Sequence, residues 1–254
     1  AGCLPGWERR CKQRRLYNVR RLSITGIGGE NRVSEIMQLP AAHYMEIALD
    51  SPDGAVPVQY WKVDLDRRCE VPFEDAASHV RQLFLRNVDL HLRSDVPVGA
   101  ALSGGIDSSS IVCAIRHLYP SIDLHTFSYV ADDPALSEER WVDLAAKASG
   151  AYVHKVRADP ESLTQDLDEV VSTQGECFGG TSIYAQRQVF RRAHDEGIKV
   201  MLDGQGADEV MGGYHAYLGA RLTSMLRQGR YAEAARFSRN AGRLPNQSAF
   251  RVWA

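Results

Sequence analysis

Apolar residues beyond position 73 follow helical and strand spacings in turn. A helix over 73–93 is predicted by apolar positions three or four residues apart, namely Ala76, Val80, Leu83, Phe84, Val88 and Leu92. Further helices are expected over 108–118, 138–150, 160–173 and 181–196, and short apolar runs predict strands over 98–102, 124–130, 151–156 and 199–203. This alternation predicts an α/β fold in which helices cover both faces of a parallel sheet.

Capping residues indicate where several of these helices begin and end. Ser137 is a candidate N-cap before two acidic residues, and Pro160 fits the first turn of the next helix. Gly150 and Gly197 follow the last periodic positions of their helices, where glycine commonly ends a helix.

A different pattern precedes this region. Residues 43–50 alternate well enough for one strand, 51–54 form a turn, and 56–61 fit a return strand. An isolated pair of strands is marginal in water. We therefore expect 30–61 to be a short β remnant of a larger domain, packed against something else.

Composition narrows the class of protein. The chain has 254 residues, 44% of them hydrophobic and 24% charged, with a net charge of -2, which suits a folded core. No apolar window is long enough for a membrane helix and no signal peptide is evident, so a cytoplasmic protein without membrane contacts is expected. Its five cysteines form no CxxC pair and its eight histidines no HExxH motif, so neither a disulfide framework nor a zinc site is predicted.

Charge is uneven along the chain. Residues 1–22 hold seven basic side chains against one acid, whereas the remainder holds 23 basic and 31 acidic ones. Residues 1–29 are interpreted as a disordered, solvated basic arm. Contact with nucleic acid is the alternative for this arm, but it is not the expectation.

The first candidate site is a glycine-serine loop between the strand 98–102 and the helix 108–118. Its residues, SGGIDSS from Ser103 to Ser109, offer backbone N–H groups and hydroxyls to an anion at a helix N-terminus. Asp107 would repel a phosphate unless a cation such as Mg²⁺ lay between them. Neither a Walker loop nor a GxGxxG turn is present. A merely structural turn is the plain alternative.

A hydrolase is a second alternative for this loop. Residues 101–105 read AxSxG, close to the nucleophile elbow GxSxG, which would make Ser103 a nucleophile. The downstream histidines that could serve as its base are His154, His194 and His215. A second glycine-acid loop argues against this reading. It runs from Leu202 to Tyr214 as LDGQGADEVMGGY, and it provides another carboxylate, Asp208, for the same metal and phosphate cluster.

These motifs together resemble a known family. SGGIDSS is similar to the SGGxDSS motif of ATP pyrophosphatases. With LDGQGADEVMGGY and the lead-in 92–99, it resembles the synthetase domain of glutamine-dependent asparagine synthetases over roughly 57–218. The resemblance implies the adenine-nucleotide α-hydrolase type of fold. It assigns 62–254 to part of an ATP-dependent synthetase domain and 30–61 to the end and linker of a glutaminase-like domain.

The resemblance also implies a reaction and a set of site residues. ATP would activate the side-chain carboxylate of aspartate as an acyl-adenylate, and ammonia would then displace AMP. Asp107 and Asp208 would face Mg²⁺, while Leu102 and Tyr129 would lie at the nucleoside and Asp203 with Gly204 would close over it. The pyrophosphate would be held by Ser103, Gly104, Gly105, Asp107, Ser108 and Ser109.

Two departures from the family pattern bear on the chemistry. The usual loop reads SGEGxDE, and Gln205 stands in the place of its catalytic glutamate. An amide can orient a reactant but cannot take a proton. Residues 175–182, near the expected acceptor site, show no clear signature for aspartate.

Several alternatives therefore stay open. The acceptor could belong to a β-lactam or lasso-type macrolactam synthetase, or the chain could be a catalytically silent nucleotide-binding fragment. Family members begin with a glutaminase domain and continue beyond the synthetase motifs, so we expect the chain to be truncated at both ends. Ammonia would come from a glutaminase domain or partner outside this chain, and a homodimer is compatible with these expectations.

Overall fold

The computed structural model describes residues 10–22, 33–34, 36–64, 70–157, 160–175 and 180–244. The chain divides into two compact units, one comprising residues 1–80 and 165–184 and the other 81–164 and 185–254. In chain order the elements are α1 (Gln13–Leu22), β1 (His43–Tyr44), the 3-10 turn Pro52–Gly54, β2 (Val58–Gln59), α2 (Phe73–His91), β3 (Val98–Ala101), α3 (Ile106–Leu118), β4 (His125–Tyr129), α4 (Glu139–Ser149), β5 (Tyr152–Val156), α5 (Pro160–Gln174), α6 (Ser182–Asp195), β6 (Val200–Leu202), α7 (Ala207–Met211), α8 (Ala216–Arg227) and α9 (Tyr231–Ala241).

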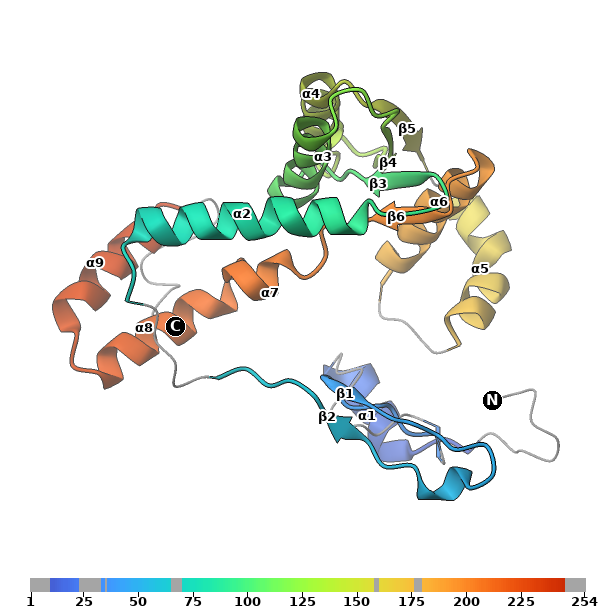
Figure 1. The fold of residues 1–254 in the computed structure, drawn as a ribbon, viewed down its shortest axis with the longest axis horizontal. Coiled ribbons are helices and arrows are strands. Elements are labelled where there is room, and N and C mark those ends of the chain that lie inside the picture. Colours follow the sequence, from blue (N-terminus) through green and yellow to red (C-terminus); the bar gives the residue numbers. More distant parts are fainter. Residues whose placement is uncertain are drawn as a thin grey trace. The chain divides into compact units, whose positions relative to one another are not determined.

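The larger unit is built on a four-stranded parallel sheet in the order β5-β4-β3-β6 (Figure 1). Gly99 pairs with Met201 on one side of β3, and Ala100 pairs with Thr126 on the other. β4 and β5 pair over their full lengths, from His125 opposite Tyr152 onward. All four strands run in one direction, so their carboxyl ends lie at one edge of the sheet. The predicted parallel sheet is confirmed.

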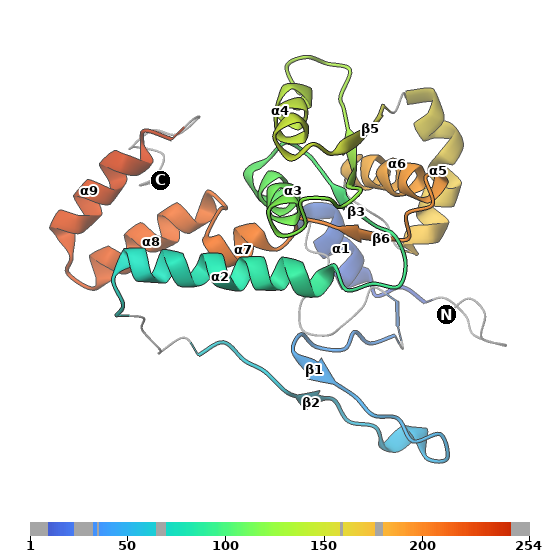
Figure 2. The same ribbon diagram turned by 45° about the horizontal axis from the view of Figure 1, so that its top comes forward.

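Two apolar clusters show that helices cover both faces of this sheet. The cluster on one face joins β3 to α2, α3 and α4, and its buried members include Val88, Ala100, Leu102, Val112, Ile115, Val142 and Ala146. On the other face, Phe127 of β4 packs against Val189 and Ala193 of α6 and against Ile198. Figure 2 shows α3 and α4 on the opposite side of the strands from α6. This arrangement agrees with the predicted fold class.

The ends of α4 differ in how well the sequence predicted them. Gly150 adopts a left-handed conformation (φ 61°) directly after the helix, as expected for a C-terminal glycine. The N-cap is Glu138, one residue later than predicted, but the Ser137 hydroxyl accepts a hydrogen bond from the Glu139 N–H at 3.3 Å. Ser137 therefore still satisfies one free amide at the start of the helix.

Arg116 joins the ends of three segments. Its guanidinium donates to the carbonyls of Ser149 (2.5 Å) and Gly150 (3.2 Å) at the end of α4. It also donates to Pro120 (2.6 Å) and Ile122 (3.0 Å), between α3 and β4. Free carbonyls at a helix C-terminus need such donors, so this one side chain ties α3, α4 and the entry to β4 together.

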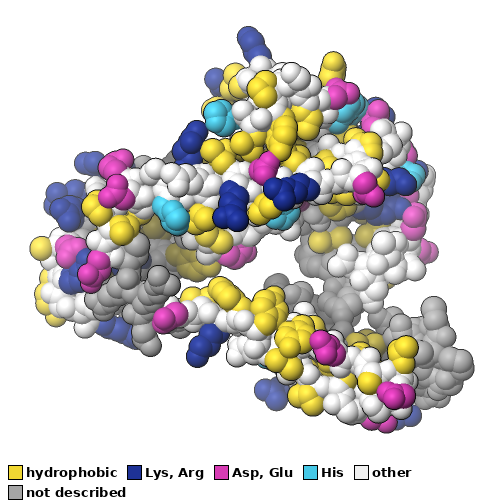
Figure 3. Space-filling model, viewed as in Figure 1, with side chains coloured by type: hydrophobic (Ala, Val, Ile, Leu, Met, Phe, Trp, Pro, Cys, Tyr) yellow, Lys and Arg dark blue, Asp and Glu magenta, His cyan; other side chains and the backbone are white. Residues whose placement is uncertain are grey.

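The smaller unit contains the predicted strand pair in reduced form. β1 and β2 are antiparallel but only two residues long each, with His43 opposite Gln59. Apolar side chains are exposed along this segment, among them Tyr44, Ile47, Leu49, Val58, Tyr60 and Trp61. Figure 3 shows hydrophobic side chains gathered over it.

Within the arm expected to be disordered, Gln13–Leu22 form helix α1.

α8 and α9 form a helical pair with its own apolar cluster. Leu222 and Met225 of α8 pack with Ala234 and Ala241 of α9. Arg230, the N-cap residue of α9, pairs with Glu233 in the first turn of that helix. Across the described ranges, no helix combines the length and apolar character needed to cross a membrane.

Candidate functional site

The first loop connects β3 to α3 and is ordered by its own serines. Ser108 is 6% exposed, and its hydroxyl oxygen accepts from the Ser103 N–H at 3.2 Å and lies 3.0 Å from the Ser103 hydroxyl oxygen. The Ser108 hydroxyl is also within 3.3 Å of the Gly105 carbonyl, and the Gly105 N–H donates to the Ser103 oxygen at 3.3 Å. These bonds fix the loop around the start of α3, where backbone amides favour an anion.

Gly104 is the residue at which this loop packs closely against the start of α4. Its backbone is in the left-handed region (φ 86°), and a Cβ placed there would lie 2.7 Å from the Cβ of Trp141 and 2.9 Å from the backbone nitrogen of Val142. Neither the conformation nor the space admits a side chain. The sequence predicted a glycine turn here but not its contact with α4.

The second loop follows β6 and is shaped by glycines. Gly206 (φ 93°) and Gly212 (φ 70°) stand immediately before and after the short helix α7. The Gly213 N–H donates to the Asp208 carbonyl at 2.9 Å, and a Cβ at Gly213 would overlap the Asp208 carboxylate. Asp208 is half-buried in this loop, whereas Gln205 is exposed.

The two loops meet at Gly204. A Cβ at this position would lie 3.1 Å from both the Cβ of Asp107 and the backbone nitrogen of Ser108. β3 and β6 are neighbours in the sheet, so loops at their carboxyl ends are brought to the same place. The structure therefore joins the two motifs that the sequence analysis singled out, although about 100 residues separate them.

The strand ends beside the first loop place two more predicted residues. Leu102 directly follows β3, is 1% exposed, and donates from its backbone N–H to the Phe127 carbonyl at 2.9 Å. Tyr129 ends β4 on the adjacent strand and is 37% exposed.

Two other predicted residues lie in α3 and after β6. Ser109, half-buried in α3, donates from its N–H to the Gly105 carbonyl at 3.0 Å. Asp203 is exposed at the end of β6.

Asp107 and Asp208 supply one carboxylate from each loop. Mg²⁺ is commonly held by one or two carboxylates together with substrate phosphates and water. Among the described residues there is no group of three or more histidine, cysteine or acidic side chains that could hold a metal. One carboxylate at the start of α3 and one in α7 are a donor set that fits Mg²⁺ arriving with a nucleotide, because the phosphates and water would supply the remaining oxygens.

A tyrosine and a glutamate of the second loop form a pair that the sequence analysis did not assign. The Tyr214 hydroxyl donates to a carboxylate oxygen of Glu209 at 2.8 Å. This hydrogen bond raises the pKa of Tyr214 above its usual value, with burial and the Glu209 charge adding to the effect. The bond links the middle of α7 to the segment that follows Gly212 and Gly213. No spacing rule would have found it, because Tyr214 lies in the irregular segment beyond the helix.

The hydrogen bonds of the first loop do not support the hydrolase alternative. Among described residues, the hydrogen-bond partners of the Ser103 hydroxyl are Ser108 and Gly105, and neither can act as a general base. His154 instead bonds His125, with Nε2 2.8 Å from Nδ1. A nucleophilic serine needs a base within hydrogen-bond reach.

Residues 176–179, within the stretch expected near the acceptor, lie outside the described residues.

Comparison with known proteins places these loops in a wider context. The asparagine synthase family model matches residues 79–254. Asparagine synthetase (glutamine-hydrolyzing) 1 of Bacillus subtilis (strain 168) is 33% identical over 171 residues, which is 65% of this chain and 26% of that protein. Amidase chyE of Penicillium rubens is 29% identical over 178 residues, covering 62% of this chain and 26% of that protein.

Among solved structures, NH3-dependent NAD synthetase from Campylobacter jejuni is 12% identical with a TM-score of 0.37, covering 57% of this chain and 61% of that one. The chain spans about a quarter of the length of the curated relatives named above. The family match covers both loops and most of the larger unit, with its sheet and helices. The chain belongs to the asparagine synthase family.

Proposed function

We propose that the larger unit carries out ATP-dependent amide formation through an acyl-adenylate. The observation that carries this proposal is the meeting of the two loops at Gly204, directly against Asp107 and Ser108. A single phosphate-binding turn would serve many proteins, whereas two loops at neighbouring strand ends suit a nucleotide that must be split between its α- and β-phosphates. Family membership supports the same chemistry.

In the proposed first step, a carboxylate oxygen of the acceptor attacks the α-phosphorus of ATP. The bond from the α-phosphorus to the bridging oxygen breaks and pyrophosphate leaves. The backbone amides of Ser103 to Gly105, with the hydroxyls of Ser103 and Ser109, would hold the leaving pyrophosphate once the Ser103 and Gly105 N–H groups exchange their bonds within the loop for bonds to phosphate oxygens. Ser108 would act mainly by ordering the loop, because its hydroxyl is engaged within it.

The nucleoside and metal have their own proposed contacts. Leu102 and Tyr129 would border the nucleoside at two adjacent strand ends, and Asp203 with Gly204 would close over it. Asp107 and Asp208 would hold Mg²⁺. The ion, when bound, neutralises charge on the phosphate oxygens as pyrophosphate departs.

In the proposed second step, the nitrogen of ammonia attacks the acyl carbon, AMP leaves with the former carboxylate oxygen, and the proton lost by the nitrogen passes to the departing phosphate or to water. Gln205 would orient the acyl group, because its amide donates and accepts hydrogen bonds but does not ionise. Aspartate is the favoured acceptor because asparagine synthetases are among the relatives. Ammonia would come from a glutaminase domain or partner outside this chain.

A second acceptor class is favoured by Gln205 itself. The neutral side chain departs from the glutamate of the motif that the second loop resembles, and one relative of the chain is named as an amidase and not as an asparagine synthetase. Other carboxylates, including those of β-lactam or macrolactam precursors, therefore belong in the same assay.

The test is ATP–pyrophosphate exchange by the 254-residue chain with aspartate and a panel of other carboxylic acids. We expect exchange that requires Mg²⁺ and falls at least about 100-fold in Asp107→Asn and Asp208→Asn, since removing one charge-stabilising group commonly costs that much. Ser110→Ala is the matched control. Its exposed hydroxyl bonds only the Ile106 carbonyl of the same helix, at 2.6 Å, among the described contacts. Absence of both ATP binding and exchange would reject the proposed function.

A further inference from the structure

The first turn of α4 is the surface on which the first loop rests. Gly104 meets the Cβ of Trp141 and the backbone nitrogen of Val142, which lie two and three residues after the helix begins at Glu139. Val142 is fully buried in the apolar cluster of that face. A displacement of this turn would therefore reach Gly104 directly, because closely packed atoms leave no slack.

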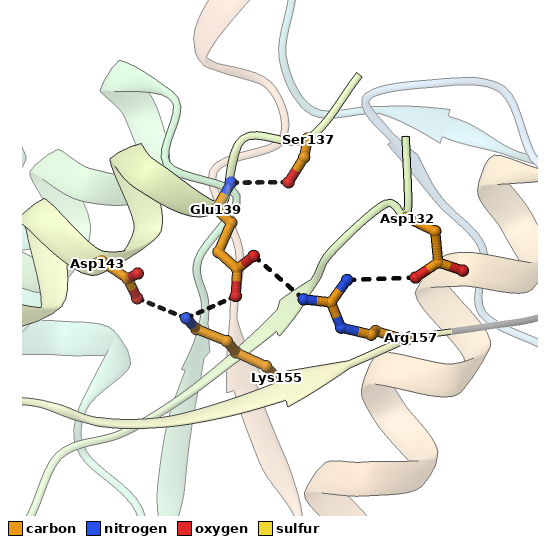
Figure 4. A network of polar contacts seen from close by, with 6 residues as sticks. All are labelled: Asp132, Ser137, Glu139, Asp143, Lys155 and Arg157. Carbon is orange, nitrogen blue, oxygen red and sulfur yellow. Dashed lines mark hydrogen bonds and ion pairs between the residues drawn. The ribbon is translucent and has the colours of Figure 1, made fainter. Parts of the chain in front are cut away.

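Five charged side chains connect this turn to the end of β5 (Figure 4). Lys155 of β5 bonds Glu139 at 2.8 Å and Asp143 at 2.7 Å, both on α4. Arg157, just beyond β5, contacts Glu139 at 3.1 Å and Asp132 at 3.2 Å. Glu139 thus accepts from two cations, and Asp132 extends the network into the segment between β4 and α4.

This network differs from isolated surface ion pairs because Glu139, Lys155 and Arg157 each take part in two contacts. One exposed ion pair contributes little, but a network that holds several side chains in place can contribute more. Glu139 also stands in the first helical turn, where the helix dipole favours negative charge, and its N–H is capped by Ser137 at 3.3 Å. The hydrogen bond from Lys155, opposed by burial and aided by its charge and by Arg157, holds the pKa of Glu139 below its usual value.

We propose that Glu139, Lys155 and Arg157 are positioning residues for the first loop. By holding the first turn of α4 against the sheet, they keep Gly104 and the adjoining residues Ser103 and Gly105 in the ordered loop conformation to which an anion binds. The role in nucleotide binding rests on the proposed function, whereas the effect on the loop itself does not. The network carries two positive and three negative charges, so it is not itself an anion site.

The first test measures amide hydrogen exchange in the ligand-free chain. Lys155→Met keeps the apolar stem and removes the cation, and Glu139→Gln removes the shared acceptor charge. We expect both variants to exchange about 3- to 10-fold faster at residues 103–105 than the unaltered chain, the effect of losing about 1 kcal/mol of local stability. The control Arg230→Met breaks an ion pair with Glu233 on α9 and should leave this loop unchanged.

The second test measures the Kd for ATP with Mg²⁺ and the thermal midpoint of the same variants. Lys155→Met should raise the Kd about 3- to 10-fold, and Lys155→Arg should restore it, while Arg230→Met should not change it. If the network only stabilised the fold, Lys155→Met would lower the thermal midpoint, and Lys155→Arg would not restore the affinity for ATP by restoring the positive charge.

The two tests separate the two proposals. Faster exchange at 103–105 in a chain that does not bind ATP would support the positioning role and reject the proposed function. Unchanged exchange at 103–105 in both Lys155→Met and Glu139→Gln would overturn the positioning role, whatever the chain binds.

Discussion

The two loops at the carboxyl edge of the sheet are ordered in different ways. The first is held by side-chain hydrogen bonds centred on the buried Ser108 and leads into a 13-residue helix. The second is shaped by left-handed glycines, Gly206 and Gly212, around a helix of only five residues. Its Val210 and Met211 side chains are largely exposed.

This difference suggests separate tasks for the two loops. A loop whose amides are fixed before a ligand arrives spends little conformational entropy on binding, which suits a phosphate cradle. A loop built around a five-residue helix with no buried side chain keeps more freedom to adjust to an acceptor. The four predictions below test this contrast, beginning with the largest expected effect.

Gly104→Ala should damage the first loop most severely. A side chain would be strained at φ 86° and would overlap Trp141 and Val142. Together these effects should lower the free energy of unfolding by about 2–4 kcal/mol and remove ATP binding. Urea denaturation and equilibrium binding would measure both losses.

The matched variant for Gly104→Ala is Gly105→Ala. Gly105 has φ -67°, and the nearest atom to an added Cβ is the Ser103 hydroxyl oxygen at 3.3 Å. It should lose less than about 1 kcal/mol. Equal losses in the two variants would show that contact with α4 does not govern the loop.

Gly204→Ala should separate the two loops without unfolding either. An added Cβ would lie 3.1 Å from Asp107 and Ser108, so the loops must part slightly. We expect about 1 kcal/mol of lost stability and a larger proportional loss in pyrophosphate exchange than in ATP affinity. Gly219→Ala, in open space within α8, is the control and should gain up to about 1 kcal/mol. If Gly204→Ala left the rate of ATP–pyrophosphate exchange unaltered, the two loops would act independently.

Two buried serines should respond in opposite ways. Ser108→Ala removes the hydroxyl at the centre of the first loop and should cost about 1–3 kcal/mol. Ser128 in β4 is also buried, but its hydroxyl has no hydrogen-bond partner in the described part of the chain. Ser128→Ala should therefore be neutral or slightly stabilising. Thermal unfolding of the pair would decide whether the loop depends on its internal bonds or on burial alone.

Mild acid should lower the free energy of unfolding of the larger unit, because it protonates His154 in the sheet that carries both loops. This ring stacks on Phe127, lies 2.8 Å from the His125 nitrogen and 3.4 Å from Glu196, and has Arg192 nearby. Burial lowers the pKa of His154, more than the opposing charge of Glu196 raises it. The unfolded chain therefore binds a proton more readily than the folded one.

The resulting stability change has a defined direction. The contribution of neutral His154 is fully present above about pH 6.5, the ordinary pKa of histidine, and is lost as the pH falls below it. Urea denaturation at pH 7.5 and pH 5.5 should show a small loss that His154→Gln reduces. An equal loss in His154→Gln would assign the acid sensitivity to other groups.

The sequence was most informative where periodicity and parallel topology combine. Spacing predicted every strand of the larger sheet and the helices α2 to α6 to within a few residues. Parallel strands then required both glycine loops to lie at one edge, so their meeting at Gly204 follows from the fold. The motif residues could be assembled into one candidate site for that reason.

Contacts between distant charged residues could not be predicted in the same way. Lys155 and Arg157 are ordinary in sequence, and many acids could have paired with them. The four carbonyl contacts of Arg116 depend on how α3, α4 and β4 converge. The strand pair is shorter than its alternation suggested, since a pattern records which residues could alternate but not how many pair.

The pairing of β3 with β6 has a consequence for how the site is made in the cell. About 100 residues separate the two strands, and contacts over such separations slow folding. At roughly 5–20 residues per second, the ribosome would make β6 about 5–20 seconds after β3. Until then the first loop exists without its partner. Nascent chains halted before Val200 should therefore lack an assembled site, even where β3, β4 and β5 have already joined.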